Sequence, residues 1–272
     1  MGEGRRAAFV GPALFALTLV AWQVAAVWRR VPSWLLPTPW RVAESMWRDR
    51  ALLWPSAATT LEETLLGFAL AVLLGVVLAV AIHLSAAVRR LVVPWLVVSQ
   101  TVPLLAFAPL LAVWFGFGLF PKVLVVFVVA FFPVVVDLAD ALRAVDADMV
   151  RLVRTMGASR LAVLWLVELP ASLPALASGV RLTAAYAVAG AVVAEWTGAT
   201  SGLGNLMIQA SSQFETADAF AAIALVSALG VALYLAVGMA ERLALPWARP
   251  APAVRRAGAL RVPNNDTGGR SE

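Results

Sequence analysis

Side chains able to do catalytic or metal chemistry are scarce in this sequence. It contains no cysteine and a single histidine, His83, which excludes thiolate sites and histidine-cluster zinc sites. A membrane-embedded enzyme would need several His, Asp, Glu or Ser side chains converging at one depth, and the scattered acids do not supply them. No G-x-x-x-x-G-K-[ST] motif occurs, so the chain has no ATP-phosphate loop of its own. We therefore predict no catalytic residue, no cofactor and no metal site.

The remaining candidates are isolated charges and prolines inside apolar runs. Glu195 is a candidate for a solute pathway because acids at membrane depth are usually functional, with simple solvation near an interface as the alternative. Arg181 could serve a pathway or extend toward the interface. Pro103 and Pro109 remove backbone hydrogen bonds and could open a pathway, although prolines are also common in membrane helices without such a role.

Three further ionisable residues stand at the ends of apolar runs. We expect His83 to be solvated or to cap a helix, since it ends one run. Asp137 and Asp140 lie one helical turn apart, a spacing that could suit a proton relay. Their predicted place at the interface favours a topological or salt-bridge role instead.

These residues belong to a chain that needs lipid around it. Of its 272 residues 62% are hydrophobic and 14% charged, against about 25% charged in soluble domains. A span needs roughly 20 apolar residues, and six runs qualify, at 7–28, 61–84, 91–115, 121–138, 174–196 and 218–245. The net charge of +5 comes from arginines that flank these runs, so we expect a lipid bilayer and not nucleic acid as the partner. The sequence predicts an all-α integral membrane protein with six transmembrane helices.

The distribution of arginine and proline predicts the topology and the domains. Most of the 21 Lys and Arg residues flank the run ends that are cytoplasmic if both termini are inside, although the loop after the first run also carries arginines. Residues 1–54 then form an N-terminal transmembrane helix and a periplasmic interfacial connector rich in Pro and Trp. Residues 55–245 form the main transmembrane domain. Residues 246–272, rich in Arg, Pro and Gly, form a disordered cytoplasmic tail.

A polar, punctuated segment at 146–171 interrupts the apolar runs. Asp146 and Asp148 suit a helix N-terminus, and the helix from Asp148 to Met156 carries one apolar stripe, made of Met149, Leu152, Val153 and Met156. Gly157 ends this helix where a left-handed residue is favourable. A second short helix, 160–168, follows and is stopped by Pro170. Periodicity alone also allows an ordinary helix lying on the lipid headgroups.

The spacing within this segment resembles the EAA loop of ABC-importer permeases. Gly157 is followed after nine residues by Val167, and after one more by Leu169-Pro170, as in that loop. The triad that names the loop is absent, since Arg151-Leu152-Val153 stands in its place. Further stretches at 99–118, 157–182 and 191–207 are similar to the nitrate/sulfonate/taurine permeases and to their relatives that import thiamine-precursor pyrimidines.

The resemblance implies a type I ABC importer transmembrane domain with a cytoplasmic coupling loop at 146–171. The chain would be a permease subunit in the bacterial cytoplasmic (inner) membrane, with separate ABC ATPase subunits, an extracytoplasmic substrate-binding protein and a second copy of itself as partners. It would form the pathway for a small solute, and the low charge of the spans disfavours a strongly anionic cargo. A secondary transporter is the alternative, but it would typically need more spans or an inverted repeat. The residues implied for ATPase coupling are Met149, Leu152, Val153, Met156, Gly157, Val167, Leu169 and Pro170.

Overall fold

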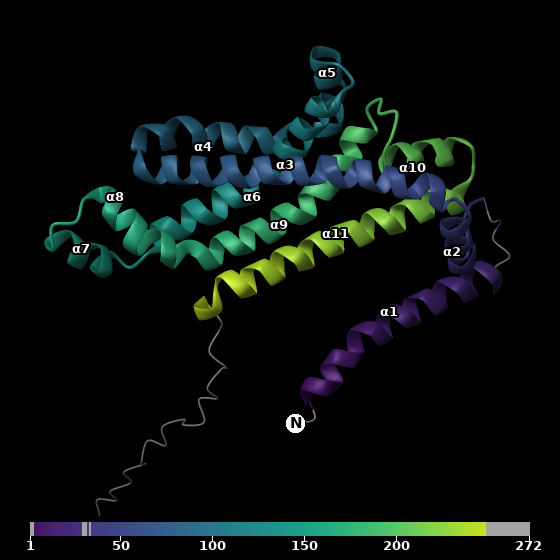
Figure 1. Cartoon of the computed structure of the whole chain (residues 1–272), viewed down its shortest axis with the longest axis horizontal. Helices are drawn as coiled ribbons and strands as arrows, with labels where there is room; N and C mark the ends of the chain where they lie inside the picture. Colours follow the sequence, from purple (N-terminus) through teal and green to yellow (C-terminus); the bar gives the residue numbers. More distant parts are fainter. Residues whose placement is uncertain (1–2, 29–31, 33, 249–272) are drawn as a thin grey trace, which may run out of the picture.

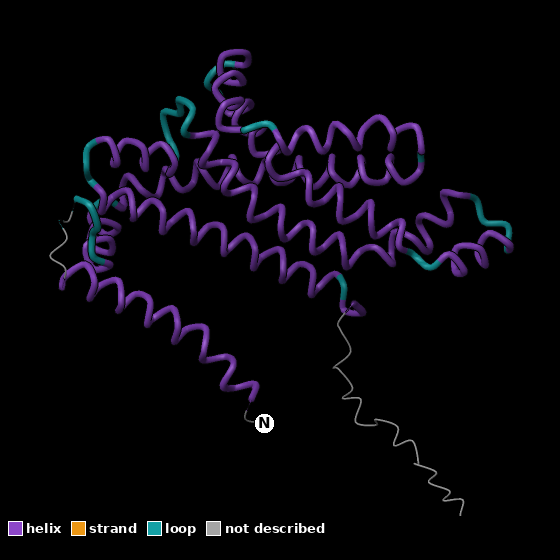
Figure 2. The backbone as a smooth tube through the Cα atoms, turned by 180° about the vertical axis from the view of Figure 1, so that it is seen from behind, coloured by secondary structure: helices purple, strands orange, loops and turns teal. Residues whose placement is uncertain are grey.

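The computed structural model describes residues 3–28, 32 and 34–248, and all regular elements in that part are helices (Figures 1 and 2). In chain order they are α1 (Glu3–Trp28), α2 (Pro39–Arg48), α3 (Arg50–Leu84), α4 (Ala86–Thr101), α5 (Leu104–Phe115), α6 (Leu119–Ala144), α7 (Ala147–Thr155), α8 (Arg160–Val163), the π-helical η1 (Leu164–Glu168), α9 (Leu169–Glu195), α10 (Leu203–Ser212), α11 (Thr216–Ala244) and the 3-10 turn η2 (Pro246–Ala248). The predicted tail beyond residue 248 lies outside the described residues.

Four of the six predicted spans are confirmed as long apolar helices. Within the described residues, the helices Arg50–Leu84, Leu119–Ala144, Arg160–Glu195 and Thr216–Ala244 are long and apolar enough to cross a membrane. They correspond to the second, fourth, fifth and sixth predicted spans. The first span lies in α1, where Ala13–Trp28 forms a shorter apolar helix.

The third predicted span is wrong as a single continuous helix. Residues 91–115 are divided between α4 and α5, which are bent by 108° relative to one another. The break falls at Val102 and Pro103, both with extended backbone (ψ 123 and 103). Proline disfavours the helical conformation in the residue before it, which explains why α4 ends there.

Proline and glycine do not interrupt helical structure at three other places. Pro55 lies inside α3, so the boundary at 54/55 falls within a helix. Pro174 lies inside α9. The Gly/Ser-rich stretch 197–217 contains α10. A proline in a membrane helix removes one backbone hydrogen bond, and neighbouring groups can compensate for it without ending the helix.

The long helices run side by side, with α7 and α8 at one end and α2 and α10 at the other (Figure 1). We call these the α7 end and the α10 end. The helix α1 meets the bundle near the α10 end, where Trp22 contacts Phe220 of α11 with ring centroids 5.5 Å apart. Its first residues point away from the other helices in both views (Figures 1 and 2). The helices α3, α6, α9 and α11 lie along one common axis, with α9 running opposite to the other three (Figure 1).

Small residues on α3 allow it to pack closely on α6. Gly67, Ala71, Gly75 and Ala79 recur every four residues and are all buried, so they form one stripe along the helix. A Cβ atom on Gly75 would lie 2.9 Å from Cγ1 of Val134, and one on Gly67 would overlap the side chain of Val126. Such small-residue stripes are typical of membrane helix pairs, because close backbone approach increases van der Waals contact.

The helix α9 packs on another face of α6 in the same way. A Cβ atom on Gly190 would lie 3.1 Å from Cα of Val126. The hydroxyl of buried Thr183 donates a hydrogen bond of 2.8 Å to the carbonyl of Ala130 on α6. Since α6 is thus held between α3 and α9, these three helices form the rigid part of the fold.

The packing of α3 on α6 predicts the effect of one added methyl group. Gly67→Ala should lower the thermal unfolding midpoint of the purified protein, because overpacking a filled core costs about 1–3 kcal/mol. Gly230→Ala is the matched control, since its Cβ would meet Val188 at an ordinary 3.9 Å. Equal midpoints for the two variants would contradict the close packing of α3 on α6.

Candidate functional site

The helix α7 presents an apolar face to its surroundings. It begins as predicted, since the Asp146 carboxylate accepts a hydrogen bond of 2.8 Å from the backbone N–H of Asp148. Met149, Leu152 and Met156 are exposed to 56%, 61% and 79%, and Val153 is half-buried. An apolar surface of this kind at a helix that lies beyond the bundle usually marks an interaction site.

A glycine turn follows α7 and sets the direction of the next helix. Gly157 has φ +88, the left-handed conformation that its place after the helix predicted. Nothing lies within 4 Å of the position of a Cβ atom there, so backbone conformation alone requires the glycine. Ser159 then caps α8, its hydroxyl accepting a hydrogen bond of 3.2 Å from the N–H of Ala162.

The second short helix of this loop does not stop at Pro170, which corrects the sequence-based expectation. The chain continues from α8 through η1 into α9, and Pro170 occupies the first turn of α9. In η1 the N–H of Leu169 bonds to the carbonyl of Leu164, five residues back. This wider turn is a π-bulge, a feature often found at functional sites. Val167 and Leu169 are half-buried and Pro170 is exposed.

The same loop is joined to the end of α3 by a largely buried contact between two side chains, His83 and Glu168. Nε2 of His83 lies 2.8 Å from Oε2 of Glu168, and the two side chains are 14% and 10% exposed. Arg160 donates a hydrogen bond of 3.3 Å to the carbonyl of His83. The expectation of a solvated or capping His83 was therefore wrong, and sequence reasoning gave Glu168 no role. The sequence offered one indication of this contact: Glu168 is an acidic residue between apolar neighbours, unlike the other charged residues of the loop, which are exposed.

A cavity of about 450 Å³ lies between the end of α4, the middle of α6 and α9. We call it the Asp137 cavity. Its polar lining residues are Ser99, Gln100, Asp137 and Tyr186, and Phe132 and Val102 are among the apolar ones. Asp140, one turn from Asp137, points elsewhere and pairs with Arg143 at 3.6 Å. The salt-bridge role expected for this acid pair is thus found for Asp140 only.

Buried polar groups gather at the α10 end. Glu195, 1% exposed, accepts hydrogen bonds from the hydroxyl of Thr60 at 2.6 Å and from the N–H of Gly204 at 2.5 Å. The hydroxyl of Thr60 also accepts a bond of 2.9 Å from the N–H of Leu203. These two side chains bind the first free N–H groups of α10, where the helix dipole favours negative charge. The alternative of a solvated Glu195 is therefore excluded.

A second buried acid, Glu63, completes this group. Its Oε1 lies 2.5 Å from Nζ of Lys122, and its other oxygen is buried without a hydrogen-bond partner among the described residues. Its carboxyl also interacts with that of Glu195. We call Thr60, Glu63, Lys122 and Glu195 the Glu195 cluster. Burying two acids requires such compensation, because removing a charge from water costs several kcal/mol.

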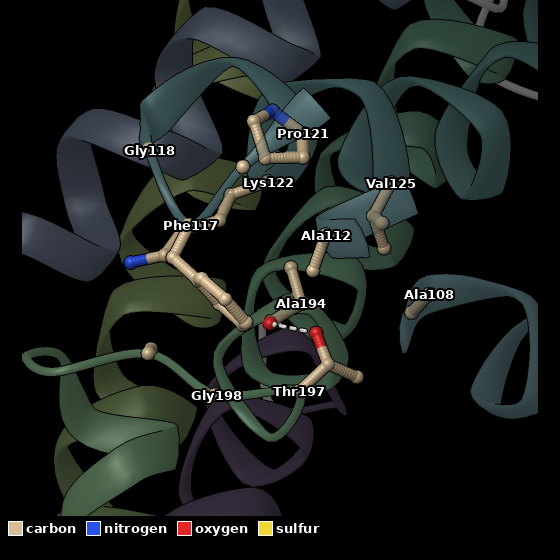
Figure 3. Close-up of a pocket in the computed structure, with 12 residues that line it drawn as sticks. Ala108, Ala112, Phe117, Gly118, Pro121, Lys122, Val125, Ala194, Thr197 and Gly198 are labelled. Atoms are coloured by element: carbon tan, nitrogen blue, oxygen red, sulfur yellow. Dashed lines mark hydrogen bonds between the residues drawn. The ribbon is translucent and has the colours of Figure 1, made fainter. Parts of the chain in front are cut away.

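Close to Lys122, the exposed side chain of Phe117 packs against the α9–α10 turn. Figure 3 shows Phe117 directed toward Thr197 and Gly198 of the α9–α10 turn. A Cβ atom on Gly198 would lie 2.9 Å from the Phe117 ring. The cavity around these residues measures about 10 Å³, roughly the space of one water molecule.

The residues predicted for a solute pathway lie in different places. Pro103 adjoins Val102, a lining residue of the Asp137 cavity, whereas Pro109 lies inside α5. Arg181 pairs with Glu241 of α11, Nε to Oε2, at 2.6 Å. Neither Arg181 nor Glu195 lines the Asp137 cavity. Their role in a pathway stays a prediction.

Comparison with known proteins identifies the kind of protein that carries these features. Residues 71–244 match the family described as the binding-protein-dependent transport system inner membrane component. The chain is 34% identical to the formylaminopyrimidine transport permease protein ThiX of Halalkalibacterium halodurans, over 87% of this chain and 95% of that protein. The chain belongs to this family. It is also 32% identical to the taurine transport system permease protein TauC of Escherichia coli, over 85% of this chain and 87% of that protein.

The solved structures agree on the fold. The MetNI methionine ABC transporter in inward-facing conformations matches with a TM-score of 0.64 and 20% identity, over 72% of this chain and 97% of that chain. The protein is thus a permease subunit of an ABC importer, a multi-pass protein of the cytoplasmic membrane with the type I transmembrane fold. It is not an enzyme, because ATP hydrolysis belongs to a separate subunit. The secondary-transporter and membrane-enzyme alternatives are thereby set aside.

The Glu195 cluster of this permease predicts a local loss of stability. Glu195→Ala would leave the buried N–H of Gly204 without its acceptor, at about 1–3 kcal/mol, whereas the Thr60 hydroxyl could still donate to the carbonyl of Ser56. We expect a lower thermal midpoint and faster proteolysis at the turn 197–202. Glu195→Gln, which keeps one acceptor oxygen, should show a smaller loss. If Gln209→Ala, at an exposed position of α10, is as damaging as Glu195→Ala, the cluster does not hold α10.

Proposed function

We propose that residues 146–171 of this importer permease are the site that couples solute transport to a cytoplasmic ABC ATPase. The observation that supports this is the exposed apolar face of α7, formed by Met149, Leu152 and Met156 beyond the end of the bundle. An amphipathic helix of this kind binds by laying its apolar face in a groove of a partner protein. The charged residues Arg151 and Arg154 lie outside this stripe and remain exposed.

The connections of the loop provide a route for movement into the bundle. From Arg160 to Glu195 the chain forms one continuous helical run, which includes the π-bulge η1. A displacement of α7 by the ATPase would therefore act directly on α9. The contact between His83 and Glu168 would extend it to α3. Coupling of this type needs an element with two discrete arrangements that both sites bias.

We further propose that two copies of the permease assemble with two ATPase subunits. Each copy supplies one coupling loop, and closed two-fold assembly is the commonest solution for soluble oligomers. Both termini lie in the cytoplasm, which places α2, α10 and the Glu195 cluster on the periplasmic side. Residues 1–54 then form the N-terminal helix and connector, residues 55–245 the transport domain, and 246–272 the cytoplasmic tail.

The relatives do not identify the solute that this permease transports. ThiX is named for formylaminopyrimidine and TauC for taurine, which differ in charge and shape. A substrate-binding protein would deliver the solute to the periplasmic side, where the turn 201–204 leads into α10.

The coupling proposal is tested by two substitutions in the loop. Gly157→Val places a β-branched residue at φ +88, at a cost of roughly 1–2 kcal/mol, and tilts the α7 face away from its groove. Leu152→Asp puts a charge into that face. Both variants should insert into the membrane at near-normal levels but lose transport and copurify poorly with the ATPase. The control Arg154→Gln, outside the stripe, should transport nearly as well as the wild type.

If both variants transport normally and the ATPase stays bound, residues 146–171 are only an interfacial loop, and the coupling proposal is wrong. The measurements are solute uptake by whole cells and ATPase recovery on the tagged permease.

The assembly proposal is tested by the mass of the purified transporter. Native mass spectrometry should find two copies of this permease with two ATPase subunits. A complex that contains one copy and a different permease chain would overturn the homodimer and leave the coupling loop unaffected.

A further inference from the structure

The Asp137 cavity lies along α6 and α9, two helices long and apolar enough to cross a membrane, and it carries polar groups. The hydroxyl of Ser99, the amide of Gln100, the carboxylate of Asp137 and the phenol of Tyr186 all line it. Polar and charged side chains within a membrane are costly against lipid, and they normally face the protein interior or a water-filled space. Facing lipid would leave four such groups against hydrocarbon in one place.

The break between α4 and α5 beside the cavity also indicates that this surface faces protein or a water-filled space. The extended residues Val102 and Pro103 separate α4 from α5, and Val102 lines the cavity. Non-helical backbone within a membrane is tolerated where it is buried in protein or lines a water-filled space. Discontinuous helices at the middle of the bilayer are also where transporters bind their solutes.

Among the residues that line the cavity, the charged side chain is the acid Asp137. In the part of the chain that the structure describes, its lining contains no Lys, Arg or His, and Asp137 makes no ion pair there. The nearest basic residues along the chain are engaged elsewhere, Arg143 with Asp140 and Arg181 with Glu241. Gly179 on α9 leaves room for the acid, because a Cβ atom there would lie 3.1 Å from Oδ2 of Asp137.

The size and the walls suit a small solute. A volume of about 450 Å³ lies within the roughly 300–1,000 Å³ of typical ligand sites. Phe132 and Tyr186 provide aromatic surface, and aromatic rings combine apolar contact area with a restricted geometry. Asp137 can only accept hydrogen bonds when ionised, so it favours groups that donate them.

We propose that the Asp137 cavity is a solute-binding segment of the translocation pathway, selective for neutral or cationic solutes that donate hydrogen bonds and closed to anions such as sulfonates. The proposal rests on the permease function of the chain and is independent of the coupling role of residues 146–171. It makes Asp137 a specificity-determining residue.

The absence of cysteine from the chain allows a direct test. Ser99→Cys introduces a single thiol of nearly the same size into the cavity. In the detergent-solubilised transporter, with both ends accessible, this thiol is reacted with a cationic reagent, trimethylammonium-ethyl methanethiosulfonate, or an anionic one, sulfonatoethyl methanethiosulfonate. Mass spectrometry of the permease chain gives the two rates. Each rate is divided by that for Ser201→Cys, an exposed position on the α9–α10 turn.

The cationic reagent should react with Ser99→Cys about tenfold faster than the anionic one after this correction, because a nearby carboxylate attracts one and repels the other. In the isosteric variant Asp137→Asn the ratio should fall to near one. Equal rates with Asp137 present would overturn the charge selectivity. No reaction with either reagent would show that the cavity is not water-filled and overturn the pathway assignment. ATPase copurification is measured separately, and its loss would test the coupling proposal for residues 146–171 and not the proposal for the cavity.

Discussion

Close backbone contact between α6 and its two neighbours is the constraint on which the rest of the structure depends. In lipid no hydrophobic force drives helices together, so association depends on dense packing and a few interhelical hydrogen bonds. The stripe from Gly67 to Ala79 on α3 and the residues around Gly190 on α9 allow that density. The central helix has little freedom to shift between them. Movement during transport must therefore occur at the ends of the bundle, or where these helices would contact a second copy of the permease.

Both ends of this rigid unit are tied by buried polar contacts that join distant parts of the chain. At the α10 end, the Glu195 cluster links α3, α6, α9 and α10. At the α7 end, His83 and Glu168 link α3 to the loop 146–171, for which we propose the coupling role. Contacts of this kind specify one arrangement, since an acid that loses its partner while buried is strongly destabilising. The apolar middle supplies packing, and the polar ends fix how the helices are placed relative to each other.

The sequence predicted what local chemistry determines and missed what only neighbours determine. Asp146 at the start of α7 and the left-handed Gly157 follow from the needs of a helix terminus, and both were predicted. Proline was a poorer guide, because Pro103 breaks a span whereas Pro55, Pro170 and Pro174 lie inside helical runs. The difference lies in whether neighbouring groups compensate for the missing hydrogen bond. The spacing of four in the α3 stripe was visible in the sequence, but its partner on α6 was not.

The partners of the buried charges could not be found from one sequence. Glu63 and Lys122 are 59 residues apart, and Thr60 and Glu195 are 135 apart, so nothing local pairs them. Their arrangement also bears on the proposed coupling, because the run from Arg160 to Glu195 joins the loop 146–171 to the α10 end, where Phe117 packs on Gly198. The Asp137 cavity borders the same helix between these two points. Because α3, α6 and α9 pack as one rigid unit, a displacement at the α7 end would be carried along α9 past the Asp137 cavity to the α10 end.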